Sequence, residues 1–175
     1  CIRDRAAGQA SDGLGWSCTV ANDAAAGLRS VSFRAVSSVR SNVVIEVSEL
    51  YTVEAEWPGE GHVSLAFADG QISLGVDSST TTVLTVQNLG NAEVSGTLDI
   101  FGQDTGLILV NWTRMSDNVE TTEFTLTAGS SIDFSVKITS NTARSASSEL
   151  TVRATSTGGG VLTTDASVPL PVSIE

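Results

Sequence analysis

Two glutamates and one histidine are the residues of this sequence best suited to acid–base chemistry. Glu54 and Glu56 lie in a run that predicts a strand over 52–57, which would place both carboxylates on one face about 7 Å apart. That separation suits an acid and a base acting on a glycosidic bond. Solvated strand faces commonly carry such pairs, however, and only Trp57 is at hand to stack on a sugar. We therefore expect a solvated face rather than a catalytic pair.

His62 is the only histidine, and it follows the turn-forming segment Pro58-Gly-Glu-Gly. A single histidine allows no more than one histidine-dependent catalytic triad. A Gly-rich connection typically holds a solvated linker residue, so this interpretation is favoured over a general base. The sequence predicts no catalytic residue and no enzyme activity.

Oxygen ligands for a cation are scattered over the predicted turns rather than gathered in one loop. No segment shows the alternating acidic spacing of a dedicated calcium loop. We expect no cofactor, and a structural calcium ion between domains is the alternative left open. The aspartates at or near turns are Asp69, Asp77, Asp99, Asp104 and Asp117.

The two cysteines, Cys1 and Cys18, enclose a Gly-rich stretch and could form one disulfide in an oxidising compartment. A zinc site is disfavoured, because the only histidine lies far away in sequence. The start at Cys1 is open to three interpretations: a mature secreted chain, a lipoprotein acylated on this cysteine, or a fragment of a longer polypeptide.

The net charge of −11 is unevenly distributed along the chain. Residues 1–50 carry five basic and five acidic residues, whereas residues 51–175 carry four basic and fifteen acidic residues. This acidic body argues against nucleic acid as a partner, because phosphate binding draws on clustered Lys and Arg. It favours a solvated surface; the alternative is that the neutral N-terminal segment docks on an acidic neighbour. No apolar run is long enough to cross a membrane.

Asn111-Trp112-Thr113 matches the acceptor pattern for N-glycosylation. Alternation along the surrounding strand puts Asn111 and Thr113 outside and Trp112 inside, so a glycan could be accepted without disturbing the core. Sugar binding through exposed aromatic residues has less support. Aromatic residues make up 5% of the chain, and Tyr51 and Trp57 are the ones available for an exposed platform.

Short alternating runs of Val, Thr and Leu, separated by turn signals, dominate the chain from residue 50 onward. This composition favours strands over helices, and no window shows convincing helical periodicity. The predicted fold class is therefore all-β, with the strand spacing of a sandwich. The predicted strands are 52–57, 63–67, 71–76, 81–88, 93–101, 107–115, 121–127, 132–139, 149–156 and 167–174.

Alternation also assigns side chains to inner and outer faces. Trp112, for example, lies on the same side of its strand as Ile108 and Val110. The last strand carries Pro169 and Pro171, which indicates an edge strand. The residues expected in cores are Trp16, Phe33, Trp112, Phe134, Val136 and Val152.

The region 63–175 resembles the CARDB and NEW3 type of immunoglobulin-like domain found in archaeal and bacterial surface proteins. The matching features are the Val-Gln-Asn-Leu-Gly-Asn turn at 86–91, Trp112, the Ala128-Gly129 turn before a strand, and the Arg-Ala-Thr-Ser end at 153–156. The resemblance implies an immunoglobulin-like β-sandwich. It implies no single function, because such modules serve as spacers, adhesion units and sugar-binding appendages.

An internal repeat divides the chain. The segment 16–38 repeats the layout of the segment 134–156, and the Val-Ser-Phe-Arg-Ala run at 31–35 falls on the Leu-Thr-Val-Arg-Ala run at 150–154. The predicted domains are the C-terminal part of an immunoglobulin-like sandwich (1–50), a junction (51–62) and a complete sandwich (63–175). The residues expected to set the junction are Tyr51, Trp57, Pro58 and Gly59.

The first sandwich is expected to be incomplete, since too few residues precede Trp16 to supply its missing strands. An incomplete sandwich exposes apolar faces and unpaired strand edges. Either the chain was cut from a tandem array, or a neighbouring molecule supplies the missing strands by donor-strand complementation. A free-standing lipoprotein explains the cysteine but not the missing half.

These predictions together indicate a non-enzymatic, extracellular structural module, the repeating unit of a surface layer, stalk or filament. Strand pairing and interdomain packing would be its mechanism. Its expected partners are further copies or domains of the same protein in donor-strand or head-to-tail contacts, with a glycan as another candidate. Two alternatives stay open: a glycan-binding or adhesion module attached to a larger secreted protein or enzyme, and an enzyme fragment whose catalytic domain lies outside these residues.

Overall fold

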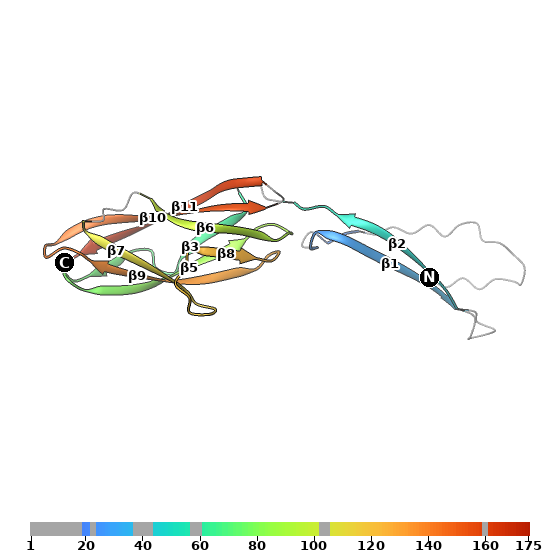
Figure 1. Ribbon diagram of the computed structural model, residues 1–175, viewed down its shortest axis with the longest axis horizontal. Coiled ribbons are helices and arrows are strands. Elements are labelled where there is room, and N and C mark those ends of the chain that lie inside the picture. The colour runs from blue at the N-terminus through green and yellow to red at the C-terminus, as the bar shows by residue number, and fades with distance from the viewer. Residues whose placement is uncertain (1–18, 22–23, 37–43, 57–60, 102–105, 159–160) are drawn as a thin grey trace, which may run out of the picture. The chain divides into compact units, whose positions relative to one another are not determined.

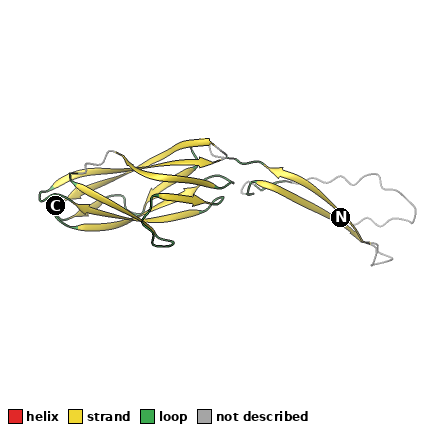
Figure 2. Cartoon of the chain, in the orientation of Figure 1, coloured by secondary structure: helices red, strands yellow, loops and turns green. Residues whose placement is uncertain are grey.

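The computed structural model describes residues 19–21, 24–36, 44–56, 61–101, 106–158 and 161–175. The chain divides into two compact units, residues 1–54 and 55–175. The described residues form strands and loops without a helix (Figure 2), so the prediction of an all-β fold is confirmed. Accordingly, this part of the chain holds no helix with the length and apolar character needed to cross a membrane.

The first unit contains a two-stranded antiparallel sheet, which we call the ribbon. It is formed by β1 (Gly27–Val36) and β2 (Val44–Val53), with Gly27 opposite Val53 and Val36 opposite Val44. The prediction of a strand over 52–57 is wrong for residues 54–56, because β2 ends at Val53, where its pairing with β1 ends; Trp57 lies outside the described residues. The alternating pattern continues past that point, but a strand requires a partner for its backbone.

The second unit is a sandwich of two sheets (Figure 1). One sheet has the order β3-β5-β9-β7 and the other the order β4-β11-β10-β6-β8. Each of these strands overlaps one that the sequence predicts. The strands are β3 (Val63–Phe67), β4 (Ile72–Leu74), β5 (Ser79–Asn88), β6 (Val94–Phe101), β7 (Ile108–Arg114), β8 (Glu123–Leu126), β9 (Ser131–Ser140), β10 (Ala146–Gly158) and β11 (Val161–Ile174).

The first segment of the sandwich contributes to both layers. β3 pairs with β5 in one sheet, and after a short turn β4 pairs in parallel with the end of β11 in the other sheet. This topology is that of an immunoglobulin-like sandwich. The prediction that the last strand is an edge strand is wrong for residues 172–174, where β11 lies between β10 and β4. At Pro169 and Pro171 its ladder partner among the described residues is β10 alone, as expected for an edge. Its two prolines are tolerated because β4 pairs only with residues 172–174, beyond both prolines.

The core lies between the two sheets and follows the alternation of the strands. Phe134, Val136 and Val152 are fully buried, and Trp112 is 7% exposed. On β7, Ile108 and Trp112 are buried. Leu109, which lies on the other side of the strand, is 48% exposed. The inner faces of the long strands of this unit are therefore mainly apolar, as expected for a two-layer sandwich. The buried polar residues on these strands are Thr82, Asn88, Ser140 and Ser156.

Gly96 in β6 stands where two neighbouring strands leave no room for a side chain. A Cβ atom at this position would lie 2.5 Å from the Thr155 carbonyl oxygen and 2.6 Å from Cζ of Phe124. Phe124 lies opposite Gly96 on β8, and Ser156 lies opposite it on β10. The glycine thus makes space for the Phe124 ring inside the sandwich.

The Asn88 side chain links the turn at 86–91 to neighbouring backbone through hydrogen bonds. Its side chain is 1% exposed, and its Nδ2 donates to the carbonyl oxygens of Ala92, Leu126 and Thr127. Its Oδ1 accepts the Gly90 N–H at 2.8 Å. One buried amide therefore joins the β5–β6 turn to the end of β8, and its donors and acceptor are satisfied.

Candidate functional site

The predicted carboxylate pair does not lie on a strand. Glu54 and Glu56 are both exposed and follow β2, so the shared strand face on which their spacing depended is absent. The backbone of Glu56 is instead tied to Asn91. Its N–H donates to Asn91 Oδ1 at 2.7 Å, and the Asn91 N–H donates to its carbonyl at 3.3 Å.

His62 is buried, and the prediction of a solvated linker residue is wrong. It is 4% exposed. Its Nδ1 lies 3.1 Å from the Ser156 hydroxyl on β10, and its Nε2 lies 3.5 Å from the Thr163 hydroxyl on β11. Because His62 immediately precedes β3, the pairing of β3 in one sheet brings the imidazole against the opposite sheet. The burial of His62 was not predicted from the sequence, because the Gly-rich segment before it is typical of a solvated linker.

The aspartates proposed for calcium are not gathered. The structure describes Asp69, Asp77, Asp99 and Asp117, and Asp104 lies outside the described residues. Within the described ranges, no group of three or more His, Cys, Asp or Glu side chains is placed to hold a metal ion. A calcium ion between domains stays a prediction.

Several predicted residues lie outside the part of the chain that the structure describes: Cys1, Trp16, Cys18, Trp57, Pro58 and Gly59. The disulfide and most of the junction therefore stay predictions. Tyr51 lies on β2, opposite Arg29 of β1. It is part of the ribbon.

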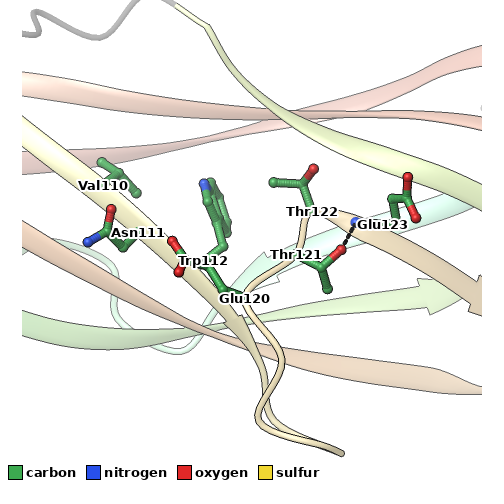
Figure 3. Close-up of a pocket in the computed structure, with 7 residues that line it drawn as sticks. All are labelled: Val110, Asn111, Trp112, Glu120, Thr121, Thr122 and Glu123. Atoms are coloured by element: carbon green, nitrogen blue, oxygen red, sulfur yellow. Dashed lines mark hydrogen bonds between the residues drawn. The ribbon is translucent and has the colours of Figure 1, made fainter.

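An open groove of about 360 Å³ lies between β7 and the segment leading into β8 (Figure 3). β7 and β8 are edge strands of opposite sheets, so the groove lies at the side of the sandwich where both sheets end. Trp112 forms its apolar wall, and Asn111, the predicted glycan acceptor, is exposed beside it. The lining residues are Val110, Asn111, Trp112, Glu120, Thr121, Thr122 and Glu123.

The loop between β7 and β8 is held by an ion pair. The Arg114 Nη2 lies 2.6 Å from Asp117 Oδ2, and the Arg114 N–H donates to the Val119 carbonyl. Asn118 adopts a left-handed backbone conformation, with φ of 57°, that asparagine tolerates. The hydrogen bond from Arg114 holds the pKa of the Asp117 carboxyl below its ordinary value of 3.8.

The hydrogen bonds at the two ends of β7 show which of its backbone groups face β9. The Leu107 carbonyl accepts the Asn141 N–H, and the Met115 N–H donates to the Asp133 carbonyl. Odd-numbered residues of β7 therefore bond to β9, and even-numbered residues point away from it.

This register leaves the backbone groups of Val110 and Trp112 without a partner in β9. Their N–H and C=O groups point to the open side of the sheet, where no described residue forms a backbone hydrogen bond with them. Arg114, the next even-numbered residue, is already satisfied by Val119. We call the backbone groups of Val110 and Trp112 the free edge of β7.

The register of the ribbon sorts its side chains into two faces. One face carries the hydroxyl contact between Ser32 and Ser48, at 2.7 Å, and the ion pair of Arg34 with Glu46. The other is mainly apolar, and we call it the apolar ribbon face. Its apolar residues are Val31, Phe33, Ala35, Ile45, Val47, Tyr51 and Val53.

The apolar ribbon face is open to solvent in the described part of the first unit. Ile45 is 63% exposed and Val47 is 51% exposed. Phe33 was expected in a core and is 38% exposed. The reason is architectural, because the described residues of this unit form one two-stranded sheet and no second layer.

Comparisons with known proteins give fold likeness alone. No protein-family model matches the chain, and no curated protein matches it. The chain is similar in structure to the S-layer protein SbsC domains 4 and 5, with a TM-score of 0.43, 14% identity, and coverage of 75% of this chain and 62% of that one. It is also similar to the PapD-like domain 7 of human CEP192, with a TM-score of 0.46, 9% identity, and coverage of 69% and 89%.

A further similar structure is a family 123 glycoside hydrolase from Clostridium perfringens, with a TM-score of 0.47 and 6% identity. The match covers 65% of this chain and 27% of the hydrolase, so this chain spans about a quarter of that protein. Likeness at these identities concerns the arrangement of strands and assigns no activity.

Proposed function

We propose that the chain is a non-enzymatic module of an extracellular or cell-surface assembly, in which copies or neighbouring domains join by strand pairing and packing. The observation that carries this proposal is the apolar ribbon face. A two-stranded sheet is marginally stable on its own, and apolar side chains are stabilised when another layer removes them from water. The covering layer would complete a sandwich like that of residues 55–175.

Two features of the sequence support this function. Residues 63–175 resemble CARDB and NEW3 domains of surface proteins in their turns. The net charge of −11 keeps a protein with exposed apolar residues soluble until it meets its partner. Donor-strand or head-to-tail contacts between copies are the form of assembly that we favour.

The test compares two double variants of the whole chain by sedimentation velocity over a wide concentration range. Ile45→Asn with Val47→Asn makes the apolar ribbon face polar. Ser30→Asn with Thr52→Asn places the same residues on the opposite face of the ribbon and is the matched control. Wild type and control should associate, and the first variant should associate at least tenfold more weakly. Equal association of both variants, or a wild type that stays monomeric, would contradict the proposal.

The groove beside Trp112 favours glycan binding or adhesion as a second candidate function. An aromatic wall with amide, hydroxyl and carboxylate groups around it is a common lining of sugar sites. Binding to a panel of immobilised glycans would test it. Saturable binding that is lost in Glu120→Gln with Thr121→Val, and kept in the ribbon variants, would support this function.

A further inference from the structure

β7 is the longest of the four edge strands of the sandwich. It has seven residues, whereas β3 has five, β4 has three and β8 has four. Proteins protect sheet edges by keeping them short or by placing charges and prolines on them. The stretch Ile108–Trp112 has neither a charge nor a proline. This edge therefore lacks the usual protection against pairing with another strand.

The free edge of β7 offers two N–H donors and two C=O acceptors, from Val110 and Trp112. Those groups have the spacing that an added extended strand requires. At one end the loop to β8 limits the pairing, because the Arg114 N–H is occupied by Val119. An incoming strand would extend the four-stranded sheet and cover the groove.

The charge of the groove selects the kind of strand that fits. Glu120 and Glu123 line it next to Trp112, and both are exposed. Two cations lie near these carboxylates. Arg114, at the end of β7, is ion-paired with Asp117 and also donates to the Glu123 carbonyl oxygen. Lys137 lies opposite Asn111 on β9. A strand with positive charge and no carboxylate would thus be favoured over an acidic one.

β1 has that character, and β2 does not. β1 carries Arg29 and Arg34 and no acidic residue, whereas β2 carries Glu46 and Glu49 and no basic residue. Arg34 is ion-paired with Glu46 across the ribbon, so Arg29, on the other face, is the cation of β1 on which the charge argument rests. β1 pairs with β2 along one edge, and its second edge has no ladder partner among the described residues. Both strands are equally long, so charge is the property that separates them.

We propose that the free edge of β7 accepts β1 from a second copy of this chain. This inference rests on the proposed function, and it names the surface and the strand through which copies join. The contact is heterologous, because β1 of one copy meets β7 of the next. Repetition of such a contact produces an open filament or a ring rather than a closed pair.

A proline substitution tests the pairing without disturbing the sheet. Val110→Pro removes an N–H that β9 does not use, so the β7–β9 ladder keeps its bonds. The control is Thr125→Pro on β8. The Leu98 N–H donates to the Thr122 carbonyl oxygen, so the backbone groups of even-numbered residues in this segment point toward β6. The Thr125 N–H therefore points away from β6. Circular dichroism of both variants reports whether the fold is kept.

We expect Val110→Pro to raise the Kd of self-association about tenfold or more, the factor that corresponds to the loss of one or two hydrogen bonds. Thr125→Pro should associate like wild type. Association of Val110→Pro at the wild-type Kd would overturn the inference. If Val110→Pro is unfolded, the charge exchange below decides.

The charge exchange uses the whole chain and leaves β7 unchanged. Arg29→Glu with Arg34→Glu reverses the charge of β1, and Glu120→Arg with Glu123→Arg reverses the charge of the groove. Each variant alone should associate at least tenfold more weakly than wild type at low salt. An equimolar mixture should recover association, because the reversed strand of one variant fits the reversed groove of the other. A mixture that stays dissociated would overturn the inference.

The outcomes separate this inference from the proposed function. If wild type associates and is weakened by the apolar ribbon face variant but not by Val110→Pro or charge reversal, the proposed function stands and the β7 acceptor is wrong. If wild type does not associate at any concentration, both are wrong.

Discussion

The Ser156 hydroxyl oxygen lies 3.1 Å from Nδ1 of His62, although 94 residues separate them in the sequence. Ser156 is fully buried in β10, and His62 is 4% exposed at the start of β3. The contact joins the residue before β3 to β10 of the opposite sheet. It therefore holds the segment that leads into β3 against β10.

Ser156→Ala should lower the free energy of unfolding by about 1–3 kcal/mol, because it removes a hydrogen-bond partner from a buried imidazole nitrogen. Ser147→Ala, at an exposed position of the same strand, is the control and should change it by less than about 0.5 kcal/mol. Urea denaturation gives both values. Equal effects of the two substitutions would show that the His62 contact is not stabilising.

Gly96→Ala should destabilise the sandwich by about 1–3 kcal/mol, because the added methyl group overlaps the Thr155 carbonyl and the Phe124 ring. Gly70→Ala is a matched control, since a Cβ there meets nothing within 4 Å. Phe124→Leu should make the Gly96→Ala change less costly in a double-mutant cycle. Additive effects of the two substitutions would contradict the proposed ring–glycine contact.

Trp112→Ala should cost about 3–5 kcal/mol as a truncation of a large core side chain. Leu109→Ala, at a half-exposed position of the same strand, should cost less than about 1 kcal/mol. Guanidinium denaturation measures both. A loss below about 1 kcal/mol for Trp112→Ala would show that the inner face of β7 has been assigned incorrectly.

Asn88→Asp should destabilise the protein by about 1–3 kcal/mol or more, because a carboxylate replaces an amide that donates to three carbonyl oxygens. Asn111→Asp makes the same change at an exposed position of β7 and should be nearly neutral. Thermal unfolding of the two variants compares them directly. Similar melting temperatures would exclude a structural role for the Asn88 amide.

The Arg114–Asp117 pair should contribute a small, acid-sensitive stabilisation. Because folding lowers the pKa of Asp117, its contribution is present above the ordinary value of 3.8 and is lost as the pH falls through the lower pKa of the folded state. The stability difference between wild type and Asp117→Asn should therefore shrink as the pH is lowered from neutrality through this range. A difference that grows in acid would contradict this sign.

The alternation of Val, Thr, Leu and Ile was sufficient to predict β3 to β11, because residues that alternate between core and solvent leave a period of two in the sequence. The same reasoning failed at 54–56 and at His62. In both places the outcome depends on a partner strand far along the chain: β1 ends the pairing of β2, and β10 with β11 covers the imidazole. Local composition contains no information about such partners.

The sequence by itself determined the all-β class, the positions of the sandwich strands along the chain and the side of each strand that faces inward. These features follow from local periodicity and turn residues. Tertiary structure alone decided that β7 and β8 are edges of opposite sheets beside a groove, that Val110 and Trp112 leave backbone groups unpaired, and that the apolar ribbon face lacks a covering layer in the described residues. The physical reason is that hydrogen-bond pairing and burial are relations between distant segments, and a strand pattern states what a residue prefers without naming its partner.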